Sequence, residues 1–181
     1  MSTDRYMTTD AESSALTRAE LAMIRAMEAF SRWAFFLNKA VSNSALSHQD
    51  IALLHSIRMR GGAQNLSELL LFLNRNDVST IQYSLRKLEQ HGFVERMVGN
   101  SKREAGYTLT PAGLENTEAY SRVRQEVMVK LIAEINQFVP ALENAAAAFE
   151  RLTGVYDQST QTILNRKILD PASQGGSTRQ I

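Results

Sequence analysis

The sequence predicts a mainly α-helical protein that carries one small β-hairpin, and two observations lead to this fold class. Only three prolines occur in 181 residues, Pro111, Pro140 and Pro171, and each stands where a helix is expected to begin or end. Apolar residues recur at spacings of three or four over most of the chain, but alternate with polar ones around 93–98 and 107–109. With 44% hydrophobic and 22% charged residues, the chain has the composition of one globular domain.

The first two helices are expected in the first third of the chain. Nothing breaks a helix between Leu16 and Ala45, and apolar residues from Leu16 to Leu37 form a single stripe. The segment 47–50 offers Ser47 as an N-cap and an acid in the first turn of a second helix over 48–60. The glycine pair 61–62 indicates where this second helix ends.

A short third helix and a fourth helix with a polar face follow. Asn65 and Glu68 have the spacing of a capping box, and the run from 69 to 73 predicts a short, almost wholly buried helix. Asp77 is placed to cap a helix over 77–90, which Gly92 closes. The apolar side of this fourth helix is predicted to be Val78, Ile81, Leu85 and Leu88, and the opposite face carries Ser79, Thr80, Gln82, Tyr83, Arg86 and Lys87.

A hairpin and two more helices complete the expected elements. The alternating segments 93–98 and 107–109 predict two short strands, joined by a basic loop over 99–106. Thr110 and Pro111 provide an N-cap and a first helical position for a helix over 111–138. Pro140 is expected to start a last helix that runs to about residue 169. The order of these elements is that of a winged helix-turn-helix: two helices, a short helix, a polar-faced helix and a basic hairpin.

The residues of this module resemble a known family. The run LRKLEQHGFVER from Leu85 to Arg96, a basic wing, and LTPAG from Leu109 to Gly113 are similar to the multiple-antibiotic-resistance regulator (MarR) family. The resemblance covers about residues 47–113. It implies a transcriptional regulator that binds double-stranded DNA as a homodimer, with the outer helices forming the dimer. Members commonly bind small aromatic molecules between the first helix and the DNA-binding module, so a small-molecule effector stays open as a further partner.

The resemblance divides the chain into five parts. The expected parts are a disordered N-terminus at 1–14, a dimerisation helix at 15–46, a winged helix-turn-helix at 47–110, C-terminal dimerisation helices at 111–169 and a disordered tail at 170–181. Charge follows the same division, since residues 51–104 hold 8 basic and 5 acidic residues while both flanking parts have an excess of one acid. A positive middle suits a module that meets phosphates.

Site residues follow from this reading. The face of the fourth helix offers hydrogen-bonding groups and cations with no carboxylate before Glu89, which is typical of a surface that reads base edges and binds phosphates. The base-edge candidates are Ser79, Thr80, Gln82 and Tyr83. The candidates for phosphate or the minor groove are Arg75, Arg86, Lys87, Lys102 and Arg103. A solvent-facing helix surface is the alternative for this face, and packing against the domain is the alternative for Tyr83.

The wing departs from the family at one position. Members usually carry Asp-x-Arg in the wing, where the Asp orients an Arg that enters the minor groove. The alignment on the "LT" pair places Arg103 at the Arg position and Ser101 at the Asp position. The resemblance therefore implies a wing arginine without its usual carboxylate partner, although Ser101 or Glu104 could substitute. Lys102 and Arg103 suit phosphates or a narrow minor groove.

Several function classes are excluded or disfavoured. The chain has no cysteine, which excludes disulfides, cysteine-based zinc sites and iron–sulfur clusters. His48, His55 and His91 lack metal-ligand spacing and are interpreted as structural. No glycine-rich phosphate loop or nucleophile elbow occurs, so we expect neither an enzyme nor a cofactor. The lack of a long apolar run or secretion signal predicts a cytoplasmic protein without membrane association.

Two interpretations stay open beside the DNA-binding one. A winged-helix module can keep its fold and bind a protein instead of DNA, with the outer helices as the working surface. The modest excess of positive charge in the middle third and the serine at position 101 are what favour this alternative. Phe30, Trp33, Phe35 and Phe36 on the first helix are interpreted as core and dimer packing, with an effector site as the alternative.

Overall fold

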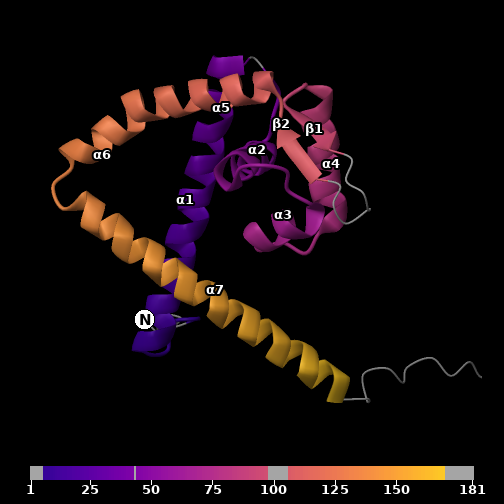
Figure 1. The fold of residues 1–181 in the computed structure, drawn as a ribbon. Helices are drawn as coiled ribbons and strands as arrows, with labels where there is room; N and C mark the ends of the chain where they lie inside the picture. The colour runs from indigo at the N-terminus through magenta and orange to yellow at the C-terminus, as the bar shows by residue number, and fades with distance from the viewer. Residues whose placement is uncertain (1–5, 43, 98–105, 170–181) are drawn as a thin grey trace, which may run out of the picture. The chain divides into compact units, whose positions relative to one another are not determined.

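The computed structural model describes residues 6–42, 44–97 and 106–169, and the chain divides into two units at Val127. The predicted fold class is confirmed, because the described elements are helices and one two-stranded antiparallel hairpin. Figure 1 shows the first unit with α1 (Ala11–Ser42), α2 (His48–Arg60), α3 (Leu66–Phe72), α4 (Val78–Gln90), β1 (Val94–Met97), β2 (Gly106–Leu109) and α5 (Pro111–Arg124). A π-helical turn, η1 (Gln125–Val129), precedes α6 (Lys130–Glu134) and α7 (Phe138–Leu169) of the second unit.

Helix α1 begins and ends earlier than the sequence predicted. It begins at Ala11 because Asp10 caps it: the Asp10 carboxylate accepts the Ser13 backbone N–H at 2.7 Å, and the Ser13 hydroxyl accepts the Asp10 N–H at 3.1 Å. It ends at Ser42, where the buried Asn38 side chain binds beyond the helix. The Asn38 amide donates to the Ser44 carbonyl at 3.2 Å and to the Ser44 hydroxyl at 2.8 Å. These side-chain hydrogen bonds compete with helix continuation.

The predicted N-cap at Ser47 and the predicted capping box at Asn65 are confirmed, and Ser47 also forms a capping box with Asp50, but the burial of α3 is not confirmed. The Ser47 hydroxyl accepts from the Asp50 N–H at 3.2 Å, and the Asn65 side chain accepts from the Glu68 N–H at 3.0 Å. The prediction of an almost wholly buried α3 is wrong, since Leu69 alone of its residues is buried and Leu71 is 83% exposed. Two turns of helix present one face to the domain, so a continuous apolar run must place some side chains in solvent.

The core of the first unit lies between α2 and α4. Leu53, Leu54 and Leu85 are fully buried there, and Leu69 and Val94 extend the cluster to α3 and the hairpin. The hairpin pairs Val94 with Leu109 and Met97 with Gly106, in agreement with the predicted strands as far as they are described. Backbone hydrogen bonds between Gln64 and Tyr107, at 2.8 and 2.9 Å, tie β2 to the segment before α3. Strand β2 thereby has a hydrogen-bonded neighbour on each side, β1 and the segment at Gln64.

The helix predicted over 111–138 is interrupted. It passes from α5 into the π-helical turn η1, and α6 ends at Glu134, after which Gln137 adopts a left-handed φ of 59°. Helix α7 begins at Phe138, two residues before the predicted start at Pro140. Proline is tolerated there because N–H groups of the first helical turn have no partner within the helix. No helix in the described part of the chain has the length and apolar character needed to cross a membrane.

Candidate nucleic-acid interface

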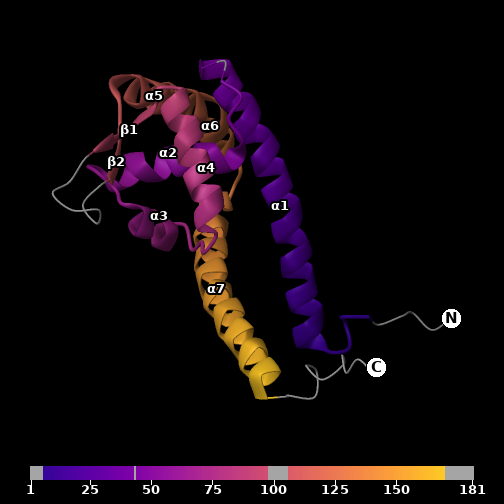
Figure 2. The same ribbon diagram turned by 90° about the vertical axis from the view of Figure 1, so that its right-hand side faces the viewer.

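Helix α4 has one buried face and one exposed polar face. The buried residues are Ile81, Ser84, Leu85 and Leu88, and the exposed ones include Ser79, Gln82, Tyr83 and Arg86. Helix α4 packs against α2, α3 and β1. Figures 1 and 2 show these elements beside one another in the first unit. The predicted burial of Val78 is wrong, since it is 43% exposed, and the small polar Ser84 is buried instead. Spacing alone could not separate these two, because each lies at an edge of the apolar stripe.

The base-edge candidates lie together on the exposed face. Ser79, Gln82 and Tyr83 stand at spacings of three and four and are exposed, which places them side by side on the helix. Thr80, at the start of the helix, is half-buried. The alternative in which Tyr83 packs against the domain is wrong, because the residue is 62% exposed. The structure therefore brings these side chains together on a surface that is open to a partner.

The three cations predicted in and before α4 have different environments. Arg86 is exposed and makes no ion pair within the described ranges 6–42, 44–97 and 106–169. Lys87 is half-buried, and its Nζ lies 2.8 Å from the Oδ2 of Asp50 at the start of α2. Arg75 binds Asp77 through two guanidinium nitrogens, with Nε donating to Oδ1 at 2.7 Å. Two of the three therefore already have a carboxylate partner.

Asp77 stands at the predicted N-cap position of α4 but does not cap the helix through its side chain. Its carboxylate instead accepts from Arg75 on the preceding turn. Hydrogen bonds from the Arg75 guanidinium, and then from the Thr80 hydroxyl, hold the pKa of Asp77 well below its usual range. The ion pair between Arg75 and Asp77 thus stabilises the turn between α3 and α4. Because Asp77 is engaged in this pair, its side chain does not cap the first turn of α4.

Asp50 and Ser84 are the residues that sequence reasoning missed at this interface. Burial raises the pKa of Asp50, but hydrogen bonds from Lys87, Ser84 and Ser47 outweigh burial and hold the pKa below its usual value. The sequence identified Asp50 as an acid in the first turn of α2. No local signal connects it with Lys87, which is 37 residues away along the chain.

The wing candidates lie outside the described residues. Lys102 and Arg103, with Ser101, belong to the segment 98–105, and their placement stays a prediction. The strands on either side of that segment are described. Met97 and Gly106 form the last pair of the β1–β2 ladder, so the wing loop leaves and returns at adjacent positions.

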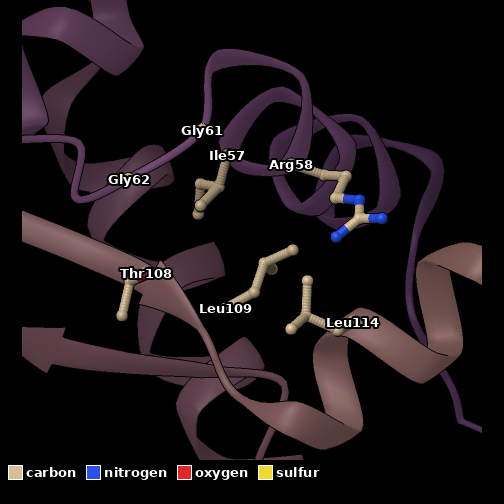
Figure 3. A pocket seen from close by; sticks show the side chains of 7 residues that line it. All are labelled: Ile57, Arg58, Gly61, Gly62, Thr108, Leu109 and Leu114. Atoms are coloured by element: carbon tan, nitrogen blue, oxygen red, sulfur yellow. The ribbon is translucent and has the colours of Figure 1, made fainter.

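A small hollow lies at the base of the hairpin. Its volume is about 170 Å³, and its lining residues are Ile57, Arg58, Gly61, Gly62, Thr108, Leu109 and Leu114. Figure 3 shows the side chains of Leu109 and Leu114 pointing toward one another, with the Arg58 guanidinium beside them. Arg58 lies 3.6 Å from Glu118, and both side chains are largely exposed, so this ion pair contributes little stability. None of the predicted site residues lines the hollow.

Trp33 of α1 and His55 of α2 have the packing expected of structural groups, whereas the predicted core packing of Phe30, Phe35 and Phe36 is wrong, because all three are exposed. The rings of Trp33 and Tyr120 meet edge-on, with their centroids 5.8 Å apart. The centroid of the His55 ring lies 4.4 Å from that of Tyr120. Desolvation of His55, and then the positive charge of Arg124, lower its pKa to about 4. Phe36 is 65% exposed and contacts Phe35. Among the residues whose positions are described, no three His, Asp or Glu side chains gather as a metal site would require.

The comparisons with known proteins agree with this geometry. Residues 46–113 match the family model described as "Winged helix DNA-binding domain". A crystal structure of a MarR family transcription regulator is 17% identical, with a TM-score of 0.66 over 81% of this chain and 95% of that one. A mutant MarR from E. coli complexed with operator DNA is 20% identical, with a TM-score of 0.57 over 78% and 99%. None of the curated proteins searched matches the sequence.

The S. aureus MepR–DNA complex is a further similar structure. It is 15% identical to this chain, with a TM-score of 0.56 over 75% of this chain and 94% of that one. The element order and the family match define residues 46–113 as a winged-helix domain. The resemblance to the MarR family is confirmed at the level of the fold, which includes helices on both sides of that domain.

Proposed function

We propose that the protein is a MarR-like transcriptional regulator that binds a pseudo-palindromic DNA operator as a homodimer. The observation that carries this proposal is the exposed face of α4, where Ser79, Gln82, Tyr83 and Arg86 stand together in a winged-helix domain. A helix of 13 residues is about 20 Å long at 1.5 Å per residue, which suits a major groove. Similar structures include MarR and MepR in complex with DNA, which supports the same use here.

The side chains divide into two roles. Ser79, Thr80, Gln82 and Tyr83 would contact base edges, while Arg86 would bind a phosphate beside them. Arg75 would bind a phosphate in place of its present partner Asp77. Both side chains of this ion pair are partly exposed, so breaking the pair costs little. Lys102 and Arg103 of the wing would reach phosphates or an adjacent minor groove. Lys87 was assigned to phosphate on the sequence, and its contact with Asp50 gives it a second candidate role.

Exposed apolar residues on the outer helices support association of two copies. They are Leu16, Leu21, Ile24, Met27 and Phe30 on α1, and Val139, Leu142, Phe149, Val155 and Ile163 on α7. Apolar residues at this density on one helix are commonly covered by another subunit. Two recognition helices related by a two-fold axis need half-sites about one helical turn apart, roughly 34 to 36 Å. The operator would therefore be a pseudo-palindrome.

Regulation would act on the separation of the two recognition helices. A small-molecule effector that binds one separation more tightly shifts the equilibrium by the difference between its two affinities. Nothing in this function needs a catalytic group or a cofactor, and it places the protein in the cytoplasm with the DNA.

The alternative is a winged-helix protein-interaction module that does not bind DNA. Residues 51–104 carry a net charge of only +3, from 8 basic and 5 acidic residues, and this favours the alternative. Salt separates the two functions, because DNA binding releases counterions and weakens steeply as salt rises. We expect duplex affinity to fall by at least tenfold between 50 and 200 mM salt for a dimer with several phosphate contacts. A salt-insensitive complex, or no complex with DNA, would favour the protein-interaction module.

Replacing Arg103 by alanine tests the wing. We expect duplex affinity to fall by more than tenfold, since each of the two subunits loses an arginine contact worth roughly 1 to 3 kcal/mol. Fluorescence anisotropy with a labelled duplex measures the change, and light scattering checks that the mass in solution is unaltered. Arg58→Ala is the matched control, because Arg58 is an exposed arginine of α2 outside the proposed interface. Equal affinities of Arg103→Ala and Arg58→Ala would remove the wing contact from the proposal.

A further inference from the structure

One carboxylate is buried in the contact between α2 and the recognition helix α4. Asp50 is 2% exposed, although it lies in the first turn of α2. Its Oδ2 accepts the Ser47 backbone N–H at 2.8 Å and the Lys87 ammonium at 2.8 Å. The same oxygen therefore closes the cap of α2 and holds a residue of α4.

Apolar side chains of both helices lie in the core around this carboxylate. Leu54 of α2 and Leu85 and Leu88 of α4 are fully buried in the same core cluster as Ile51. Apolar side chains of similar shape pack well in more than one setting, so an apolar contact specifies a helix's rotation weakly. A buried ion pair adds little net stability, but it can select one arrangement, because any other arrangement leaves a buried charge without its partner.

Lys87 is suited to this role by its position on α4. Consecutive helical residues point about 100° apart, so a Lys87 turned toward α2 leaves Arg86 directed to solvent. The side chain of Lys87 is 25% exposed, and Arg86 is classed among the exposed residues. Ser84, one turn earlier on the same side of α4, is buried, and its side chain helps to lower the pKa of Asp50. Lys87 of the recognition helix thus binds the carboxylate of α2 directly, and the neighbouring Ser84 acts on the pKa of the same group.

We propose that Asp50 is a positioning residue for DNA recognition, which holds Lys87 and thereby sets the rotation of α4 that presents Gln82 and Tyr83 to the bases and Arg86 to a phosphate. In this role Lys87 serves the orientation of the helix and neutralises no phosphate. The inference rests on the proposed function, since it needs α4 to be the recognition helix. It differs from the assignment of Lys87 to phosphate in one measurable respect, the number of cations that DNA binding engages.

The test uses the double variant Asp50→Asn/Lys87→Met, which removes both charges and leaves neither one buried alone. Affinities for a duplex selected by the wild-type protein from a random pool, and for an unselected duplex, are measured over a range of salt. We expect the ratio of the affinities for the selected and the unselected duplex to fall about tenfold, which is the size of effect that coupled side chains commonly have. The slope of affinity against salt should stay that of the wild type. Arg86→Met is the matched control, for which the slope should fall by about 0.9 per subunit.

A second measurement needs no DNA. Urea unfolding of Lys87→Met, Asp50→Asn and the double variant gives the coupling between the two side chains. We expect Lys87→Met to be less stable than the double variant, because it alone leaves a buried carboxylate without a cation. Equal stabilities of Lys87→Met and the double variant would contradict the ion pair between Asp50 and Lys87.

The outcomes separate the inference from the proposed function. A salt slope of the double variant that falls as it does for Arg86→Met would overturn the inference and return Lys87 to the phosphate contacts. An unchanged preference for the selected duplex would overturn it as well. If the wild type selects no sequence, the proposed function fails and takes the positioning role with it, while the unfolding measurements still report the coupling of Asp50 and Lys87.

Discussion

Replacing Gly113 by alanine should lower the free energy of unfolding by about 3 kcal/mol or more, as severe overpacking of backbone does. A Cβ at this position would lie 2.0 Å from the Phe93 carbonyl oxygen and 2.9 Å from its carbon. The contact is held from several directions, since the Thr110 N–H donates to that same oxygen at 3.1 Å. The Thr110 hydroxyl also donates to the Gly92 carbonyl at 2.5 Å. The start of α5 therefore cannot move away from the turn before β1 without losing these bonds.

Gly154→Ala is the matched control for this substitution. Gly154 lies within α7, and a Cβ there would have nothing within 4 Å. We expect the control to be stabilising by up to about 1 kcal/mol, because alanine favours helix more than glycine does. Urea unfolding of both variants, followed by circular dichroism, compares the same change in two settings. A Gly113→Ala protein as stable as the wild type would contradict the close approach of α5 to Phe93.

Acid should destabilise the protein through His55. The pKa of His55 is lowered to about 4 in the folded state, while the unfolded chain has the ordinary value near 6.5. Between these values the unfolded state binds a proton that the folded state does not, so stability falls as the pH falls. The two pKa values differ by about 2.5 units, and we therefore expect a loss of about 3 kcal/mol between pH 7.5 and pH 4 from this residue alone.

His55→Phe isolates the contribution of the imidazole. Phenylalanine keeps a ring against Tyr120, which lies 4.4 Å from the His55 ring, and it cannot be protonated. Carboxylates add to the loss at lower pH, among them Asp50, whose stabilising ion pair is lost as the pH falls below 3.8 through its lowered pKa. The prediction is therefore a difference: unfolding free energies of the wild type should fall more steeply with acid than those of His55→Phe. Parallel pH profiles of the two proteins would contradict the prediction, because they would mean that the pKa of His55 is not lowered in the folded protein.

Much of the fold could be predicted because its signals are local. Both capping boxes, at Ser47 and Asn65, use residues three apart, and the change from helical spacing to alternation located the hairpin. The base-edge candidates on α4 were also found locally, since a helical face is read from spacing alone. The same signals could not say which edge of the α4 stripe is buried: Val78, which the spacing placed on the apolar side, is exposed, and Ser84 at the other edge is buried.

What could not be predicted depends on contacts between distant segments or on small differences in backbone energy. The pairing of Asp50 with Lys87 needs the packing of α2 on α4, which no local pattern encodes. The π-helical turn η1 lies in a sequence, QEVMV, that a regular helix would accept equally well. The apolar run of α3 was read as buried because hydrophobicity reports a tendency and not the area that the neighbours cover.

The central claim, that a dimer of this protein reads a DNA sequence with α4, is tested most directly by selection. The purified full chain selects duplexes from a random pool at physiological salt, and light scattering records its mass in solution. We expect an enriched pseudo-palindrome with half-sites about one helical turn apart, roughly 34 to 36 Å, bound by a dimer. A folded protein that enriches no sequence would contradict the claim and favour a winged-helix module that binds another protein.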